Sequence, residues 1–251
     1  MLGAMGIRIF GVHERPGAPP AHGSAEPSTT SAQVSVPRAP SSDVARRPSH
    51  THAEPAQRPD IATLDWTALR EAVSACRACP LSQSRQQTVF GVGHSQAHWM
   101  IVGEAPGEQE DRQGEPFVGP AGQLLDNMLL ALGLTRSEAP PERQVFIANT
   151  LKCRPPKNRN PEPAETAQCA PFLDRQIALV QPRIILAMGR FAAQALLASD
   201  EPLGKLRGRV HAWRGVPVVV TYHPAYLLRT LADKARAWED LCLAASVAQG
   251  A

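Results

Sequence analysis

Four cysteines in two widely separated pairs constrain the fold of this chain more than any other feature. Cys76 and Cys79 form a C-x2-C pair, 15 residues lie between Cys153 and Cys169, and 73 residues lie between the pairs. A fold that uses all four thiols together must bring distant segments into contact. Four thiolates suit either an iron–sulfur cluster or a structural zinc ion, because both prefer soft sulfur ligands.

Disulfide bonds and plain core thiols are the alternative interpretations of these cysteines. The sequence shows neither a pattern typical of a secretory leader nor the cysteine density of a secreted scaffold, so we expect reduced thiols. The pairing of a C-x2-C motif with a second spaced pair favours a metal or a cluster. The fifth cysteine, Cys242, lies in a late apolar helical stripe, where we expect a small buried hydrophobic residue.

The first 60 residues differ from the rest in composition. They hold nine of the 24 prolines and a single aromatic residue, Phe10. Such a segment buries too little apolar surface to offset the entropy lost on ordering, so residues 1–60 are predicted to be a disordered tail. Residues 61–251 then form one folded domain of ordinary size. No stretch is long enough to span a bilayer, and we expect a soluble, cytoplasmic protein.

Short apolar runs alternate with helical patterns through the predicted domain. The predicted strands are residues 98–102, 145–149, 183–188 and 216–221, and the predicted helices are residues 64–75, 120–132, 161–180 and 190–197, with further helices toward the end. Near-continuous apolar strands separated by helices are typical of parallel sheets covered on both faces. We therefore predict an α/β fold with three α/β/α layers and a central, mainly parallel, four-stranded sheet.

Ligands of such sheets bind at the carboxyl ends of the strands. The residues at or just after the four predicted strand ends are Glu104, Asn149, Gly189 and His223. Three of these are polar groups suited to recognising or transforming a base or a sugar. The strand ends are therefore the candidate functional site.

Four ordered motifs resemble those of the family 4 uracil-DNA glycosylases. They are residues 103–111 (GEAPGEQED), 116–122 (PFVGPAG), 149–156 (NTLKCRPP) and 223–225 (HPA). The resemblance covers about residues 69–243 and includes the four cysteines, which in that family hold a [4Fe-4S] cluster. It implies a monofunctional hydrolase that excises uracil from DNA in the first step of base excision repair. It also implies a monomer that acts on single- or double-stranded DNA.

The resemblance assigns a uracil-binding role to Phe117, Asn149 and Ala105. A glycosylase must extrude the nucleotide from the helix, and the extruded base needs an aromatic face, for which Phe117 is the candidate. The Asn149 amide offers one acceptor and two donors, which complements N3–H and O4 of uracil but not the edge of cytosine. Ala105 is expected to lie beside the base edge.

Cleavage of the glycosidic bond expels uracil as an anion and leaves a sugar with oxocarbenium character. His223 is expected to donate a hydrogen bond to O2 of the leaving base. Glu104 is the preferred candidate to orient the water, but Glu110 and Asp111 stand in the same motif. The sequence alone leaves the choice among these three carboxylates open.

The expected DNA contacts lie in two segments. Lys152 and Arg154 belong to a basic loop, and Arg229 follows His223, so all three are candidate phosphate contacts. Leu227 or Tyr226 is a possible wedge between bases. A different class of function, a zinc-stabilised nucleic-acid-binding module without catalysis, is the alternative. A Rossmann-like nucleotide site is disfavoured, because the G-x-G-x-x-G pattern is absent.

Overall fold

The computed structural model describes residues 60–250, and the predicted tail lies outside them except for Asp60. Their strands form one six-stranded sheet in the order β1-β3-β2-β4-β6-β5. The strands are β1 (Val92–Gly93), β2 (Trp99–Gly103), β3 (Phe146–Asn149), β4 (Ile184–Met188), β5 (Val210–Trp213) and β6 (Val216–Thr221). The α-helices are α1 (Trp66–Ala75), α2 (Leu81–Ser84), α3 (Glu108–Gln113), α4 (Pro120–Ala131), α5 (Pro163–Val180), α6 (Arg190–Leu197), α7 (Leu203–Leu206), α8 (Pro224–Leu227) and α9 (Lys234–Gln249). Three short 3-10 turns cover Ile61–Thr63, Pro156–Asn158 and Leu231–Asp233.

The four predicted strands are β2, β3, β4 and β6, and they pair in parallel with one another. The predicted number of four strands was nevertheless too low, because β1 and β5 add an antiparallel strand at each edge of the sheet. β1 has only two residues, and β5 alternates exposed and half-buried side chains. Neither segment therefore carries the continuous apolar pattern that marks a buried strand.

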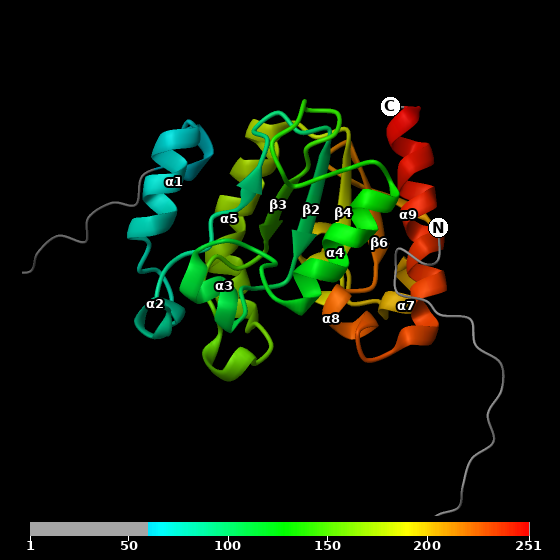
Figure 1. The fold of residues 1–251 in the computed structure, drawn as a ribbon. Helices are drawn as coiled ribbons and strands as arrows, with labels where there is room; N and C mark the ends of the chain where they lie inside the picture. The colour runs from blue at the N-terminus through cyan, green and yellow to red at the C-terminus, as the bar shows by residue number, and fades with distance from the viewer. Residues whose placement is uncertain (1–59, 251) are drawn as a thin grey trace, which may run out of the picture. The chain divides into compact units, whose positions relative to one another are not determined.

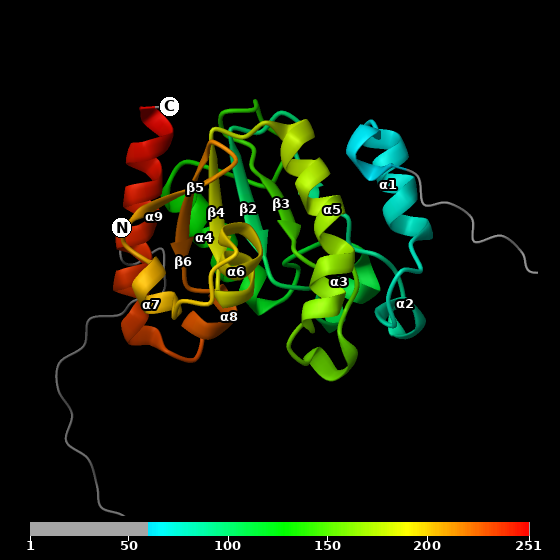
Figure 2. The ribbon, with the colours of Figure 1, turned by 180° about the vertical axis from the view of Figure 1, so that it is seen from behind.

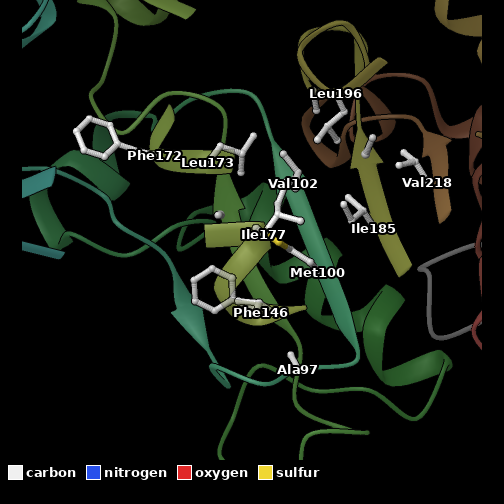
Figure 3. Packing of buried hydrophobic residues seen from close by; sticks show 14 of the residues in the cluster. Ala97, Met100, Val102, Phe146, Phe172, Leu173, Ile177, Ile185, Leu196 and Val218 are labelled. Atoms are coloured by element: carbon white, nitrogen blue, oxygen red, sulfur yellow. The ribbon is translucent and has the colours of Figure 1, made fainter. Parts of the chain in front are cut away.

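Helices cover both faces of the sheet, as predicted. α4 and α9 lie over one face (Figure 1), and α5 and α6 lie over the other (Figure 2). Alternate residues of β2 explain why both faces must be covered, since Met100 and Val102 join one apolar core while Trp99 and Ile101 join the other. Figure 3 shows the first core, in which Met100 and Val102 lie near Ile177 of α5.

The helix that precedes the first cysteine pair has a defined start. Asp65 caps α1, and its carboxylate accepts a hydrogen bond from the Ala68 backbone N–H at 2.8 Å. Leu69 and Val73 are the buried residues of this helix, and α1 packs against α5. This packing places Cys76, the residue that ends α1, beside the helix that carries Cys169.

The carboxyl ends of the parallel strands lie level with one another. Gly103 of β2 pairs with Asn149 of β3, and Met188 of β4 pairs with Thr221 of β6. The arrowheads of β2 and β3 point toward the end of the sheet where α3 and α8 lie (Figure 1). Among residues 60–250, no helix is long and apolar enough to cross a membrane.

Candidate active site and cysteine centre

A cavity of about 480 Å³ opens at the carboxyl edge of the sheet. The predicted site residues that line it are Glu104, Ala105, Glu110, Phe117, Asn149, His223 and Arg229. Tyr226, the alternative wedge residue, lines it as well. The structure therefore brings together side chains that are up to 125 residues apart in the sequence.

Phe117 forms an aromatic wall of the cavity. Its ring stacks on the His223 ring, with the centroids 5.4 Å apart and the planes inclined by 26°. Its backbone is left-handed, with φ of 56°, which a non-glycine residue adopts only when its surroundings impose it. Gly122 makes this loop possible, since a Cβ there would lie 1.7 Å from the Phe117 carbonyl oxygen.

Gly103, at the end of β2, is closely approached by two side chains of the cavity. A Cβ at this position would lie 2.4 Å from Asn149 Oδ1 and 2.6 Å from Phe117 Cζ. Both side chains therefore meet over a residue that has no side chain of its own. The close approach explains why glycine ends this strand.

Asn149 presents an unsatisfied acceptor at this point. The residue is 2% exposed, and no donor within residues 60–250 reaches its Oδ1. A buried oxygen without a partner costs free energy that a bound donor would recover. The cavity is therefore prepared for a ligand with an N–H group directed at Asn149.

The His223 ring is held in a neutral form. Burial lowers the pKa of His223 to about 4, and the positive charge of Arg229 adds to this lowering. Nδ1 accepts a hydrogen bond from the Ala225 backbone N–H at 3.1 Å, so the proton of the neutral ring is assigned to Nε2. The Nε2–H group is then the donor that His223 can offer to a ligand.

The three candidate carboxylates, Glu104, Glu110 and Asp111, have different environments. Asp111 is 2% exposed, and its carboxylate accepts hydrogen bonds from the Gln86 backbone N–H at 3.0 and 3.1 Å. Glu110 accepts from the backbone N–H groups of Val118 and Gly119, which follow Phe117. Both carboxylates are therefore occupied in holding loops.

Glu104 is the carboxylate that remains available to a ligand. Within residues 60–250 its side chain makes neither a hydrogen bond nor an ion pair, and it lines the cavity. Burial raises the pKa of Glu104 above its ordinary value, and the positive charge of Arg190 opposes this in part. An acid with these properties suits the handling of a proton or a water molecule.

The four paired cysteines line a second, smaller cavity. They come from four places: the end of α1, the approach to α2, the loop after β3, and α5. Arg85 donates to Cys153 Sγ at 2.8 Å, and the Lys152 backbone N–H donates to Cys169 Sγ at 3.3 Å. In the described part of the chain, no three His, Cys, Asp or Glu side chains are close enough to hold a single metal ion. Four thiols around one space, two of which receive hydrogen bonds, are the ligand type that a sulfur-bound metal group requires.

Without a bound group, these thiols are hard to ionise. Burial raises the pKa of Cys169 to about 12, and burial also raises the pKa of Cys153. The fifth cysteine does not belong to this set. Cys242 is exposed, so the expectation of a buried residue was wrong.

Two of the expected DNA contacts do not reach the surface. Lys152 is 1% exposed, and its ammonium donates to the Asn149 carbonyl oxygen and to Gln176 Oε1, so it cannot contact a phosphate in this conformation. Leu227 is fully buried in the core beneath α8, so it cannot act as a wedge in this conformation. The exposed apolar residues of this region are Leu228 and Leu231.

The other two expected contacts are accessible. Arg229 is exposed at the cavity. Arg154 is partly exposed, forms an ion pair with Glu108 at 3.6 Å and donates to Asn158 Oδ1 at 2.8 Å. Sequence reasoning missed Arg85 as a partner of the cysteines, because an isolated arginine between two motifs carries no local signal.

Comparisons with known proteins agree with this geometry. The family model of the uracil DNA glycosylase superfamily matches residues 90–242. A type-4 uracil-DNA glycosylase of Pyrobaculum aerophilum is 42% identical over 188 residues, which are 72% of this chain and 93% of that protein. One of Sulfurisphaera tokodaii is 43% identical over 64% of this chain and 74% of its own length. One of Archaeoglobus fulgidus is 42% identical over 64% of this chain and 81% of its own length.

The matched region contains the cavity, two of the cysteines that line the smaller space, and all four ordered motifs. This chain therefore belongs to the uracil-DNA glycosylase superfamily and, within it, to the type-4 uracil-DNA glycosylases.

Proposed function

We propose that this protein hydrolyses the N-glycosidic bond of deoxyuridine in DNA and so begins the repair of deaminated cytosine. The observation that carries the proposal is the buried, unpaired Oδ1 of Asn149 in a cavity lined by Phe117 and His223. Uracil has an N–H group at N3 that would satisfy this oxygen. Cytosine has an unprotonated N3, and its exocyclic amine would meet the amide nitrogen of Asn149.

Each residue of the cavity has a distinct role in this reaction. Phe117 stacks on the extruded base, Asn149 binds N3–H and O4, and Ala105 lies along the base edge. His223 donates Nε2–H to O2 and stabilises the leaving anion, which favours departure without a full proton transfer. Its neutral form persists over the physiological pH range, because burial keeps its pKa at about 4.

Glu104 is our candidate for the residue that orients the attacking water. Its carboxylate lines the cavity and has no hydrogen-bond partner within residues 60–250. Glu110 also lines the cavity, but its carboxylate and that of Asp111 accept hydrogen bonds from backbone N–H groups. A negative charge at this position would also stabilise the positive charge that develops on the sugar. The role is general base or electrostatic support for the cleavage.

The substrate is expected to approach across the rim of the cavity. Arg229 and Arg154 are our candidate phosphate contacts, and Tyr226 is the remaining candidate for a contact with the displaced base pair. Contacts of this kind read no sequence, which suits an enzyme that must search DNA of any sequence. We propose that the protein works as a monomer in the cytoplasm and that residues 61–251 form the catalytic domain.

We further propose that Cys76, Cys79, Cys153 and Cys169 hold a [4Fe-4S] cluster. The fit is supported by the common cavity of the four thiols and by the hydrogen bonds donated to two of the sulfurs. The cluster would tie α1 and α5 to the loop after β3, and the cleavage itself belongs to the other residues. The type-4 relatives do not favour the alternative of a non-catalytic zinc module.

The direct test uses the purified full chain and a pair of oligonucleotides that differ in one base. Incubation with the uracil oligonucleotide, followed by alkali, should cleave the strand at that position, and the cytosine oligonucleotide should stay intact. Intact uracil oligonucleotide after prolonged incubation with iron-loaded protein would overturn the proposal.

The Glu104 assignment predicts a specific pH dependence. Because burial raises the pKa of Glu104 above 4.5, kcat/KM should fall on the acid side at a pH above that value, as the carboxylate gains a proton. In Glu104→Gln this acid limb should disappear, and activity at neutral pH should be about 10²-fold lower. His223 titrates at a lower pH than this limb, since burial lowers its pKa to about 4. The measurement is excision rate against pH for both proteins, and an unchanged limb in Glu104→Gln would exclude Glu104.

A further inference from the structure

The Lys152 side chain lies between the two cavities. It lines the smaller cavity together with the four cysteines, and its ammonium donates to the Asn149 carbonyl oxygen at 2.7 Å. The same ammonium donates to Gln176 Oε1 at 2.6 Å. The Lys152 side chain therefore lies beside the cysteines and also contacts the backbone of Asn149, the residue that we assign to uracil recognition.

Gln176 completes a buried chain of hydrogen bonds. It lies in α5, is fully buried, and donates from Nε2 to the Phe90 carbonyl oxygen at 2.8 Å. The chain thus joins the end of β3 to α5 and to the segment that precedes β1. Hydrogen bonds to a charged donor are stronger than neutral ones, and in a buried setting they fix the groups that they join.

Burying an ammonium costs free energy because the charge loses its hydration, and hydrogen bonds to buried acceptors must compensate for this cost. Lys152 has no ion pair with a carboxylate within residues 60–250, so its two carbonyl-type acceptors are the groups that hold it. The Asn149 backbone sits at the last residue of β3, and its side chain direction depends on where that backbone is held. By holding the Asn149 carbonyl oxygen, Lys152 therefore also holds the Asn149 side-chain amide in its position beside Gly103.

We propose that Lys152 is a positioning residue for uracil recognition, which acts through Asn149 and links the recognition amide to the cysteine-bearing segment. This inference rests on the proposed function, because it assumes that Asn149 binds the base. It replaces the expectation that Lys152 contacts a DNA phosphate. Gln176 is a second positioning residue, because it holds the Lys152 ammonium.

The test is a binding measurement that does not depend on hydrolysis. The probes are an oligonucleotide with 2′-fluoro-2′-deoxyuridine, whose glycosidic bond resists cleavage, and one with a tetrahydrofuran abasic site, which offers no base. Lys152→Met and Gln176→Met should each raise Kd for the fluorouridine probe, by roughly tenfold to hundredfold for Lys152→Met. Kd for the abasic probe should stay within about twofold of wild type, since Asn149 has nothing to bind there. Gln176→Glu keeps the acceptor for the ammonium but loses the donor to the Phe90 carbonyl oxygen, so it should bind the fluorouridine probe more tightly than Gln176→Met does and less tightly than wild type.

A double-mutant cycle separates positioning from general damage. If Lys152 acts through Asn149, then Lys152→Met combined with Asn149→Ala should bind the fluorouridine probe no more weakly than Asn149→Ala alone. Additive losses, or equal weakening of both probes, would overturn the inference. If Lys152→Met purifies without iron, Gln176→Met decides the question by the same two probes. If Asn149→Ala itself binds the fluorouridine probe as wild type does, the base-recognition role of Asn149 fails instead.

Discussion

Asn149→Ala is expected to lower kcat/KM for uracil excision by about 10³-fold, which is the largest effect of any single change in the cavity. The substitution removes the acceptor for N3–H and the donor for O4 at once, in a buried place where water cannot fully replace them. The measurement is single-turnover excision from a uracil oligonucleotide, followed by alkaline cleavage. The iron content and the visible absorbance should match those of wild type, because Asn149 does not touch the cysteines.

The matched control is Asn127→Ala. Asn127 is an exposed residue of α4 that does not line the cavity, so its loss should leave kcat/KM within about twofold of wild type. Full activity in Asn149→Ala would remove the basis of the recognition site. A loss of equal size in both variants would indicate damage to the fold rather than to the cavity.

Cys153→Ala is expected to abolish the broad absorbance at about 400 nm and to reduce the iron content from about four atoms per chain toward zero. It should also lower the midpoint of thermal unfolding, because binding of a metal group by the folded state contributes directly to its stability. Cys153 lines the smaller cavity and receives a hydrogen bond from Arg85, so the substitution removes one of the four proposed ligands.

Cys242→Ala is the matched control for this experiment. Cys242 is exposed on α9 and does not line the smaller cavity, so iron content and absorbance should remain those of wild type. Stoichiometric zinc in place of iron in the wild-type protein would contradict the cluster. Retention of all the iron in Cys153→Ala would contradict the ligand set.

The interior of the fold could be predicted from the sequence because its signals are local. The strands β2, β3, β4 and β6 are continuous apolar runs, and each coincides with its predicted range to within one residue at either end. The edge strands lack such runs, because only one side of an edge strand is paired and its residues are partly exposed. The prediction failed where burial is incomplete.

Side-chain direction could not be predicted from the sequence. On α9 the buried residues include Ala237, Leu241 and Ala244. Cys242 follows Leu241 directly, so its side chain is turned about 100° away from the core. The position of the apolar stripe depends on how the helix lies on β6 and β4, which the sequence does not report. Leu227 and Leu228 were indistinguishable for the same reason, although one is buried and the other exposed.

The sequence alone determined the chemistry that is present: paired thiols, polar residues where apolar runs stop, and an alternation that forces a covered parallel sheet. Only the tertiary structure decided which charged groups are available to a ligand. Lys152 donates a hydrogen bond to Gln176, and Asp111 accepts one from Gln86, while the Glu104 carboxylate lines the cavity without such a partner within residues 60–250. The physical reason is that hydrogen bonds between residues 24 or 25 apart depend on how helices and loops pack, and packing is a property of the whole core.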